Sequence, residues 1–178
     1  MSRIGKQPVK LPAGVVATVE GNTLTVKGPK GELQRTFEQG ISLAVEGDSI
    51  VVTRADDSRR LRGFHGLTRT LAHNMVVGVT QGYKKELTIE GTGFKAQIQG
   101  NKLLLSLGFA SPKEYLIPEG ITITEKQGTA LTVEGMSKEL VGTAAARIRS
   151  YYPAEPYKGK GIKYLGEQIR RKEGKTVA

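Results

Sequence analysis

The sequence contains no cysteine and no tryptophan among its 178 residues. Without cysteine there is no disulfide framework, no thiolate nucleophile and no cysteine-ligated zinc or iron–sulfur site. Long apolar runs are missing too: the longest, such as residues 14–19 and 75–79, fall far short of the roughly 20 residues that span a bilayer. The amino-terminal residues form a short basic arm without an apolar stretch, so we expect no secretory signal and no membrane contact.

Acidic residues are outnumbered by basic ones. Asp and Glu total 17 against 27 Lys and Arg, which gives a net charge of +10 and a pI near 9.8. The imbalance is uneven, since residues 138–178 hold 10 basic and 4 acidic side chains while residues 83–137 hold 6 of each. Basic charge concentrated in one segment is typical of a protein that binds a polyanion, most often nucleic acid. A basic enzyme is the alternative that charge alone leaves open.

A weak internal repeat organises the chain. When the sequence is shifted by 79 residues, small and apolar residues match at corresponding places. The matches include Gly14 with Gly93, Ala17 with Ala96, Leu24 with Leu103, Ser58 with Ser137, Leu61 with Leu140 and Gly63 with Gly142. Because the expected order of strands and helix repeats as well, we interpret the pattern as a duplication.

Each half of the sequence predicts two β-hairpins followed by one helix. Alternating β-branched residues around glycine-containing turns are typical of paired strands. The expected strands cover residues 15–20, 24–27, 41–45 and 50–54 in the first half, and 87–90, 96–99, 103–107, 121–125 and 130–134 in the second. One helix is expected from an Asp57 or Ser58 cap to about Gly78, and the other from a Ser137 cap to about Ser150.

The expected fold class is therefore α+β, with two tandem duplicated domains that each pack an antiparallel sheet against one helix. The domains are expected at residues 1–82 and 83–170, with a basic tail at 171–178. Spacings of three and four residues define the apolar helix faces. These faces are expected to contain Leu61, Phe64, Leu67, Leu71 and Met75 in the first helix, and Leu140, Val141, Ala144, Ala145 and Ile148 in the second.

Motifs for catalysis or metal binding are scarce. His65 and His73 lie eight residues apart, whereas a metal pair on one helix face needs a spacing near four. Residues 91–96 match a Gly-x-Gly-x-x-Ala pattern, but the repeat places a strand where a dinucleotide site needs a helix. No Walker motif and no recognisable Ser, His and carboxylate triad occur. We therefore expect no metal, no cofactor and no small-molecule substrate.

The segment 151–164 combines glycine, lysine and tyrosine, and a basic tail follows at 169–175. Lysines neutralise phosphates, glycines let a backbone approach a phosphate chain and expose N–H groups to it, and tyrosines stack on unpaired bases. We interpret both segments as nucleic-acid contacts; the alternatives are an ordinary glycine-rich connection and a solvated terminus. On the first helix, Arg62, Arg69 and His73 share one face, which is either a solvated polar face or a further RNA contact.

The segment Glu155-Pro-Tyr-Lys-Gly-Lys-Gly-Ile-Lys-Tyr164 resembles the signature of the bacterial-type ribosomal protein L-six family, the sixth protein of the large subunit. Three further segments are similar to the same family, so the resemblance covers essentially the whole chain. They are Ser2-Arg-Ile-Gly-Lys6, Gly28-Pro-Lys-Gly-Glu-Leu33 and His65-Gly-Leu-Thr-Arg-Thr-Leu71. Ala154 departs from the Pro or Ser that is usual in the family, which is a conservative change in a loop.

The resemblance implies a non-catalytic protein that binds large-subunit ribosomal RNA near the sarcin–ricin loop and the translation-factor site. It implies neighbouring ribosomal proteins and translation factors as partners, and a cytoplasmic ribosome, with a plastid ribosome as the alternative. By motif position, the expected RNA-binding residues are Tyr157, Lys158, Gly159, Lys160, Gly161, Lys163, Arg170, Arg171, Lys172 and Lys175. A second expected set comprises Arg3, Lys6, Arg62 and Arg69, of which the last two alternatively support the domain interface or face another ribosomal component.

Two other classes of function are compatible with the residues alone. An enzyme acting on RNA would need a clustered acid–base pair or a cofactor loop, and the sequence shows neither. A protein-interaction module would use the sheet edges of the neutral residues 83–137. Its binding would be insensitive to salt, whereas RNA binding would weaken as salt rises.

Overall fold

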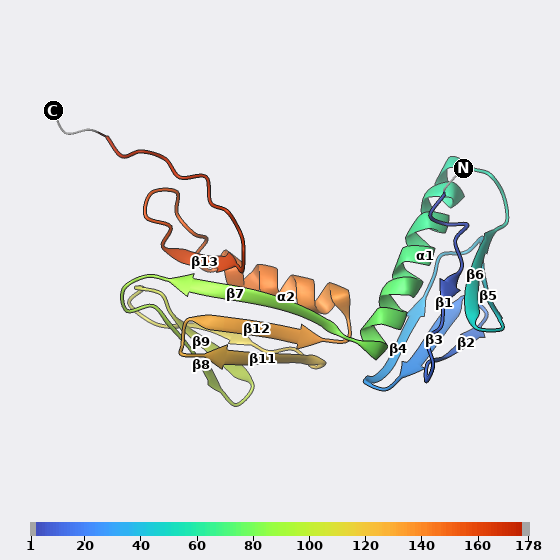
Figure 1. Cartoon of the computed structure of the whole chain (residues 1–178), viewed down its shortest axis with the longest axis horizontal. Helices are drawn as coiled ribbons and strands as arrows, with labels where there is room; N and C mark the ends of the chain where they lie inside the picture. Colours follow the sequence, from blue (N-terminus) through green and yellow to red (C-terminus); the bar gives the residue numbers. More distant parts are fainter. Residues whose placement is uncertain (1–2, 176–178) are drawn as a thin grey trace. The chain divides into compact units, whose positions relative to one another are not determined.

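The computed structural model describes residues 3–175 (Figure 1). Residues 1–2 and 176–178, the latter belonging to the expected basic tail, lie outside the described residues. The chain divides into two compact units. The first contains the residues up to Tyr83 together with Met136–Lys138, and the second contains Lys84–Gly135 and the residues from Glu139 onward. Both units combine antiparallel strands with a helix, which confirms the expected α+β class.

The first unit contains six strands in two antiparallel sheets. One sheet has the order β1-β6-β5 and the other has the order β2-β3-β4. The strands are β1 (Val9–Lys10), β2 (Val16–Glu20), β3 (Thr23–Gly28), β4 (Gly31–Thr36), β5 (Ile41–Glu46) and β6 (Ser49–Arg54). Alternate residues of β3 and β6 are buried, because successive side chains of a strand point to opposite faces. The inward residues form the core against helix α1 (Arg59–Thr80).

Helix α1 begins at the predicted Ser58 cap, whose hydroxyl accepts a hydrogen bond from the Leu61 backbone N–H at 3.3 Å. The expected apolar face is partly wrong, since Leu67 is 50% exposed. The buried residues of this helix are Leu61, His65, Thr68, Ala72, Met75, Val76, Gly78 and Val79. From Leu61 to Met75 the buried positions are three or four residues apart, and they include the polar His65 and Thr68, which apolar spacing alone does not select.

The buried His65 has a structural role. Its Nε2 lies 2.9 Å from the carbonyl oxygen of Val52, and its Nδ1 lies 2.8 Å from Nη1 of Arg54. A carbonyl oxygen only accepts and a guanidinium only donates, so Nε2 carries the proton and Nδ1 accepts. A Cβ on Gly5 would lie 2.6 Å from Nδ1, so the amino-terminal arm approaches the ring closely because this residue is glycine.

Within residues 84–175, together with Tyr83 at the start of β7, the second unit contains seven strands in two sheets. One sheet has the order β11-β12-β7-β13 and the other has the order β10-β9-β8. The strands are β7 (Tyr83–Glu90), β8 (Lys95–Gln99), β9 (Lys102–Ser106), β10 (Lys113–Leu116), β11 (Ile121–Lys126), β12 (Ala130–Gly135) and β13 (Gly161–Tyr164). Helix α2 (Lys138–Ser150) buries Val141, Ala144, Ala145 and Ile148 as expected, but Leu140 is 43% exposed and does not belong to its inner face.

The strand order shows the duplication directly. The order β5-β6-β1 in the first unit is repeated as β11-β12-β7 in the second, and β2-β3-β4 is repeated as β8-β9-β10. The first residues of β3 and β9, Thr23 and Lys102, are 79 positions apart, as are those of the two helices. Among the described residues, β13 is the strand of the second unit without a counterpart in the first.

Candidate nucleic-acid interface

Strand β13 fixes the position of the glycine- and lysine-rich segment. It pairs antiparallel with β7, from Gly161 opposite Glu90 to Tyr164 opposite Leu87. Its Ile162 is fully buried, and an isolated bridge joins this residue to Pro153. The sequence predicts a loop over the segment 151–164. In the structure, only residues 154–160 form a loop, which connects the bridge at Pro153 to strand β13. Both ends of that loop, which we call the cationic loop, are therefore held by the sheet.

Glu155 organises the cationic loop from within. Its carboxylate accepts hydrogen bonds from the backbone N–H groups of Tyr157 and Lys158, each at 2.7 Å, and from that of Lys160 at 3.4 Å. Its own N–H donates to the carbonyl oxygen of Lys160 at 2.9 Å. These backbone hydrogen bonds, that of Tyr157 first, lower the pKa of the Glu155 carboxyl from its ordinary value of 4.5. A single acidic residue in a basic segment is the signal that could have identified this role.

The glycines of the segment shape its backbone. Gly159 has φ +78° and Gly161 has φ +137°, both in the region that favours glycine. Both residues are buried, and a Cβ on Gly161 would lie 2.6 Å from Cα of Ala154. The expectation that the glycines expose N–H groups to phosphate is not met at Tyr157, Lys158 and Lys160, whose N–H groups are bonded to Glu155.

The lysines of the segment fall into two kinds. Lys158 and Lys160 are exposed, and neither forms an ion pair within the described part of the chain. Lys163 points from β13 toward Glu90, with its Nζ 2.5 Å from Oε1, and its side chain is only 22% exposed. The charge of Lys163 is thus partly neutralised by the protein. The charges of Lys158 and Lys160 are available to an external anion.

The carboxy-terminal residues lie along the cationic loop. The N–H of Lys172 donates to the carbonyl oxygen of Pro156 at 2.9 Å, and the Arg171 guanidinium lies over Gly159. At the start of this segment, the Glu167 carboxylate accepts from Nε of Arg149 at 3.0 Å and from the N–H of Tyr164 at 2.9 Å. The hydrogen bond from Arg149 is the main cause that lowers the pKa of Glu167. The exposed cations of this tail are Arg170, Arg171, Lys172 and Lys175.

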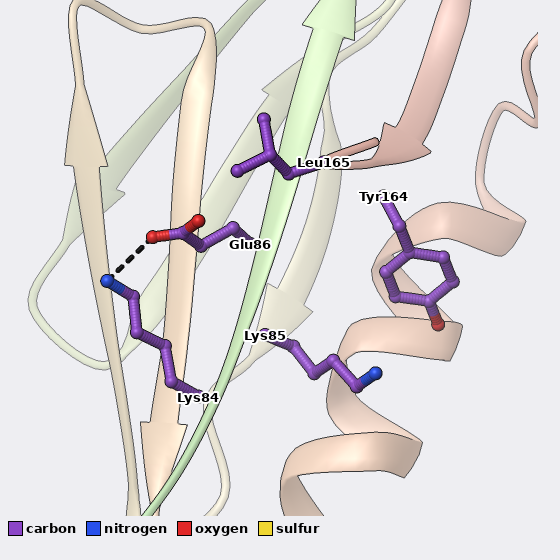
Figure 2. A pocket seen from close by; sticks show the side chains of 5 residues that line it. All are labelled: Lys84, Lys85, Glu86, Tyr164 and Leu165. Carbon is purple, nitrogen blue, oxygen red and sulfur yellow. Dashed lines mark ion pairs between the residues drawn. The ribbon is translucent and has the colours of Figure 1, made fainter. Parts of the chain in front are cut away.

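A small pocket of about 340 Å³ lies where β7 begins and β13 ends (Figure 2). Alternate residues of β7 point to opposite faces, so Lys84 and Glu86 meet in an ion pair at 2.6 Å while Lys85 lies beside Tyr164. The Lys85 Nζ is 5.6 Å from the centre of the Tyr164 ring. The ion pair occupies the carboxylate, and the pocket lining contains no nucleophile with an adjacent base.

The second expected set of cations lies in the first unit. Arg3, Lys6 and Arg62 are exposed. Arg69 is half-buried, and its Nε donates to the carbonyl oxygen of Gln7 at 3.2 Å. This contact ties helix α1 to the amino-terminal arm, so part of the charged face has a structural partner.

Neither a metal site nor a membrane span is found in residues 3–175. No group of three or more His, Cys, Asp and Glu side chains is placed to hold a metal ion in this range. Neither helix of the same range combines the length and the hydropathy needed to cross a membrane. The Gly-x-Gly-x-x-Ala pattern at residues 91–96 enters strand β8, so it is not the start of a nucleotide-binding helix.

Known protein families supply the remaining comparison. A family model described as ribosomal protein L6 matches residues 11–82 and again residues 90–165. The chain belongs to the ribosomal protein L6 family. The first matched region contains β2 to β6 and α1, and the second contains β8 to β12 and α2 together with β13.

Curated relatives resemble the L6 chain over nearly its whole length. Large ribosomal subunit protein uL6 of Thermosynechococcus vestitus is 53% identical over 99% of this chain and 98% of its own length. The uL6 proteins of Streptococcus uberis and Clostridium kluyveri are 54% and 55% identical, also over 99% of this chain and over 99% and 98% of their own lengths. The similarity to this family is therefore not limited to the four segments quoted above and extends through both units.

Proposed function

We propose that this L6 protein is a structural constituent of the large ribosomal subunit and binds large-subunit RNA through the cationic loop and tail of its second unit. Membership of the family makes it a ribosomal protein rather than an enzyme. The observation that carries the proposal is the loop built around Glu155, which holds Lys158 and Lys160 outward without ion pairs in the described chain.

Binding on this proposal is driven by charge neutralisation. Each lysine or arginine that contacts a phosphate releases condensed counterions, so affinity falls as salt rises. The backbone of the cationic loop is already ordered by Glu155 and β13, which reduces the entropy lost when RNA binds. Tyr157 is exposed beside these lysines and is suited to stacking on a base or bonding to a sugar.

Family resemblance supports a finer assignment of place and partners. We place the RNA contact near the sarcin–ricin loop and the translation-factor site, with neighbouring ribosomal proteins as further partners. The uL6 relatives named above come from bacteria, which supports a ribosome in the bacterial cytoplasm.

The first unit supplies a second proposed contact through Arg3, Lys6, Arg62 and Arg69. The first turn of α1 carries basic residues and no acidic residue, although the positive end of a helix dipole favours acidic ones. Glu38 pairs with Arg60, and Asp57, which pairs with Arg54, lies just before the helix, so the protein offsets part of this charge and an anionic partner would offset the rest. The observation supports a phosphate contact here in addition to the cationic loop.

The salt dependence of RNA binding tests the main proposal. The full chain is titrated with a large-subunit RNA fragment that contains the sarcin–ricin region, at several salt concentrations. In the double variant Lys158→Ala, Lys160→Ala, the slope of log affinity against log salt is expected to become shallower by about 0.9 for each lost phosphate contact, or somewhat less. The variant Lys27→Ala, Lys126→Ala removes two exposed lysines outside the cationic loop and is the matched control.

Three outcomes separate the alternatives. A slope that changes only in the loop variant supports the cationic loop as the phosphate contact. Equal slopes for the loop variant, the control and the wild-type chain would exclude the two loop lysines as the phosphate contact and leave the tail or the first unit as its site. Salt-insensitive binding of the RNA would overturn charge neutralisation as its cause, and no binding by the wild-type chain would overturn RNA binding and favour a protein partner.

A further inference from the structure

Three aromatic rings gather in the second unit outside the cationic loop. The Phe94 and Tyr152 ring centres are 5.2 Å apart, and those of Phe109 and Tyr152 are 5.8 Å apart, both in edge-to-face arrangements. Phe109 is 46% exposed and the other two rings are half-buried. We call these three residues the aromatic platform. An exposed phenylalanine supported by two further rings is an unusual surface for a protein with so few aromatic residues.

Two glycines make room for the platform. A Cβ on Gly91 would lie 2.5 Å from the Phe94 ring, and a Cβ on Gly108 would lie 3.3 Å from it. Gly91 and Gly108 have φ angles of +156° and +78°, so both positions also favour glycine by conformation. Gly91, the first glycine of the Gly-x-Gly-x-x-Ala pattern, is thus explained by the packing of Phe94. The platform is built into the backbone of two loops rather than formed by chance contact of side chains.

Two lysines lie next to platform residues, one in space and one in sequence. The Lys113 Nζ lies 5.0 Å from the centre of the Phe109 ring, and the exposed Lys95 follows Phe94 directly. The acidic neighbour of Lys113, Glu114, is paired with Lys102 at 2.9 Å. An aromatic face beside lysines matches a nucleotide, because the base stacks on the ring while the phosphate meets the cation.

The platform is continuous with the cationic loop. The carbonyl oxygen of Tyr152 accepts a hydrogen bond from the N–H of Ile162 in β13 at 2.8 Å. Pro153, the next residue, forms the bridge at which the cationic loop begins. The hydroxyl of Tyr151 donates to the carbonyl oxygen of Glu114 and ties the same segment to β10. One stretch of backbone therefore positions both the stacking surface and the phosphate-binding lysines.

We propose that the aromatic platform stacks an unpaired base of the RNA whose phosphates contact the cationic loop, with Phe109 as the outermost ring. This inference rests on the proposed function and extends it, since it adds a site that recognises a flipped-out or looped nucleotide to one that recognises charge. Stacking accepts every base, so the platform selects an unpaired, accessible nucleotide rather than a sequence.

The full chain is suited to a direct test because it contains no tryptophan. Phe109→Trp introduces a single tryptophan on the platform, and stacking with a base is expected to quench its fluorescence on titration with the sarcin–ricin RNA fragment. Phe109→Ala is expected to weaken binding roughly 5- to 150-fold, the equivalent of about 1–3 kcal/mol for a stacked base. The slope of affinity against salt is expected to stay at the wild-type value, because no charge is removed.

Matched variants separate stacking from general hydrophobic contact. Leu116→Ala removes another exposed apolar side chain from β10 and is expected to bind RNA like the wild-type chain. Phe109→Leu keeps apolar surface but removes the aromatic face, so it is expected to bind nearly as weakly as Phe109→Ala. Wild-type affinity for Phe109→Leu with loss only for Phe109→Ala would indicate apolar packing and overturn the stacking proposal.

The outcomes also distinguish this proposal from the proposed function. If the loop lysines control the salt slope while Phe109→Ala binds normally and Phe109→Trp is not quenched, the platform proposal fails and RNA binding stands. If the wild-type chain does not bind the RNA, both the proposed function and the platform proposal that rests on it fail.

Discussion

The first unit ends one of its sheets at β1, whereas the second unit extends the corresponding sheet beyond β7 with β13. The added strand belongs to the same carboxy-terminal segment as the cationic loop and the tail, and Ile162 secures it in the core. The shared topology of the two units therefore acts as a scaffold. Most of the proposed RNA-binding residues lie in the carboxy-terminal segment that only the second unit has among the described residues.

The two helices differ in charge as well as in length. Helix α1 has 22 residues and no acidic residue in its first turn, whereas α2 has 13 residues with Glu139 in its first turn and Arg147 and Arg149 in its last. The arrangement in α2 matches the helix dipole and contributes to its stability. In α1 the basic residues of the first turn oppose the dipole, and Glu38 offsets part of this charge through its ion pair with Arg60.

The largest expected effect comes from weakening the added strand. Ile162→Ala removes a fully buried side chain and is expected to lower the free energy of unfolding of the second unit by about 2–5 kcal/mol. Denaturant unfolding followed by NMR signals of each unit measures the loss, and the first unit should remain unchanged. Leu165→Ala, at an exposed position just after β13, is the control and should change stability by less than about 0.5 kcal/mol. A small loss for Ile162→Ala would show that β13 does not anchor the cationic loop.

Replacing a glycine with alanine is expected to lower the free energy of unfolding of the second unit at Gly161 and to raise that of the first unit at Gly63. At Gly161, alanine would be strained at φ +137° and would collide with the backbone of Ala154, so we expect a loss of about 1–3 kcal/mol. At Gly63, within α1, an added Cβ meets nothing within 4 Å, and alanine is expected to stabilise the first unit by about 0.4–1 kcal/mol. The same unfolding experiment measures both changes. Tolerance of Gly161→Ala would contradict the close approach of β13 to Ala154.

Acid is expected to loosen the cationic loop, which belongs to the segment present in the second unit alone among the described residues. The folded pKa of Glu155 is lowered, so its stabilising contribution is present above its ordinary pKa of 4.5 and is lost as the pH falls through the lower folded value. Hydrogen-exchange protection of the Tyr157 and Lys158 amides, measured by NMR across this range, follows the loss. Glu155→Gln should show weak protection at every pH. If protection of these amides in the wild-type chain does not change with pH, the Glu155 carboxylate does not hold the loop.

Sequence reasoning succeeded where structure depends on local patterns. The Gly21-Asn22 and Gly100-Asn101 turns predicted hairpins that the structure shows as β2-β3 and β8-β9. The Ser58 cap and the ends of both helices follow from local rules in the same way. The duplication was detectable because both copies retain these local signals. For the candidate site, the residue types alone identified the exposed Lys158 and Lys160.

Sequence reasoning failed where structure depends on distant partners. The Gly-Lys-Gly composition at residues 159–161 favours a loop, and nothing local indicates that the following residues pair with β7, about 70 positions earlier. The role of Glu155 depends on a turn that brings three N–H groups to one carboxylate. The burial of His65 depends on Val52 and Arg54, which satisfy its nitrogens from another element.

A last pair of variants, of which Leu140→Ala has the smallest expected effect, tests whether matching positions of the repeat are packed alike. Leu61 and Leu140 occupy matching positions of the two copies, yet Leu61 is 8% exposed and Leu140 is 43% exposed. Leu61 packs against Gly40, whose missing side chain leaves space for it, so Leu61→Ala is expected to lower the free energy of unfolding of the first unit by about 2 kcal/mol or more. Leu140→Ala is expected to change that of the second unit by at most about 0.5 kcal/mol. Equal losses in the two units would mean that the duplicated helices pack alike, and that exposure of Leu140 does not distinguish them.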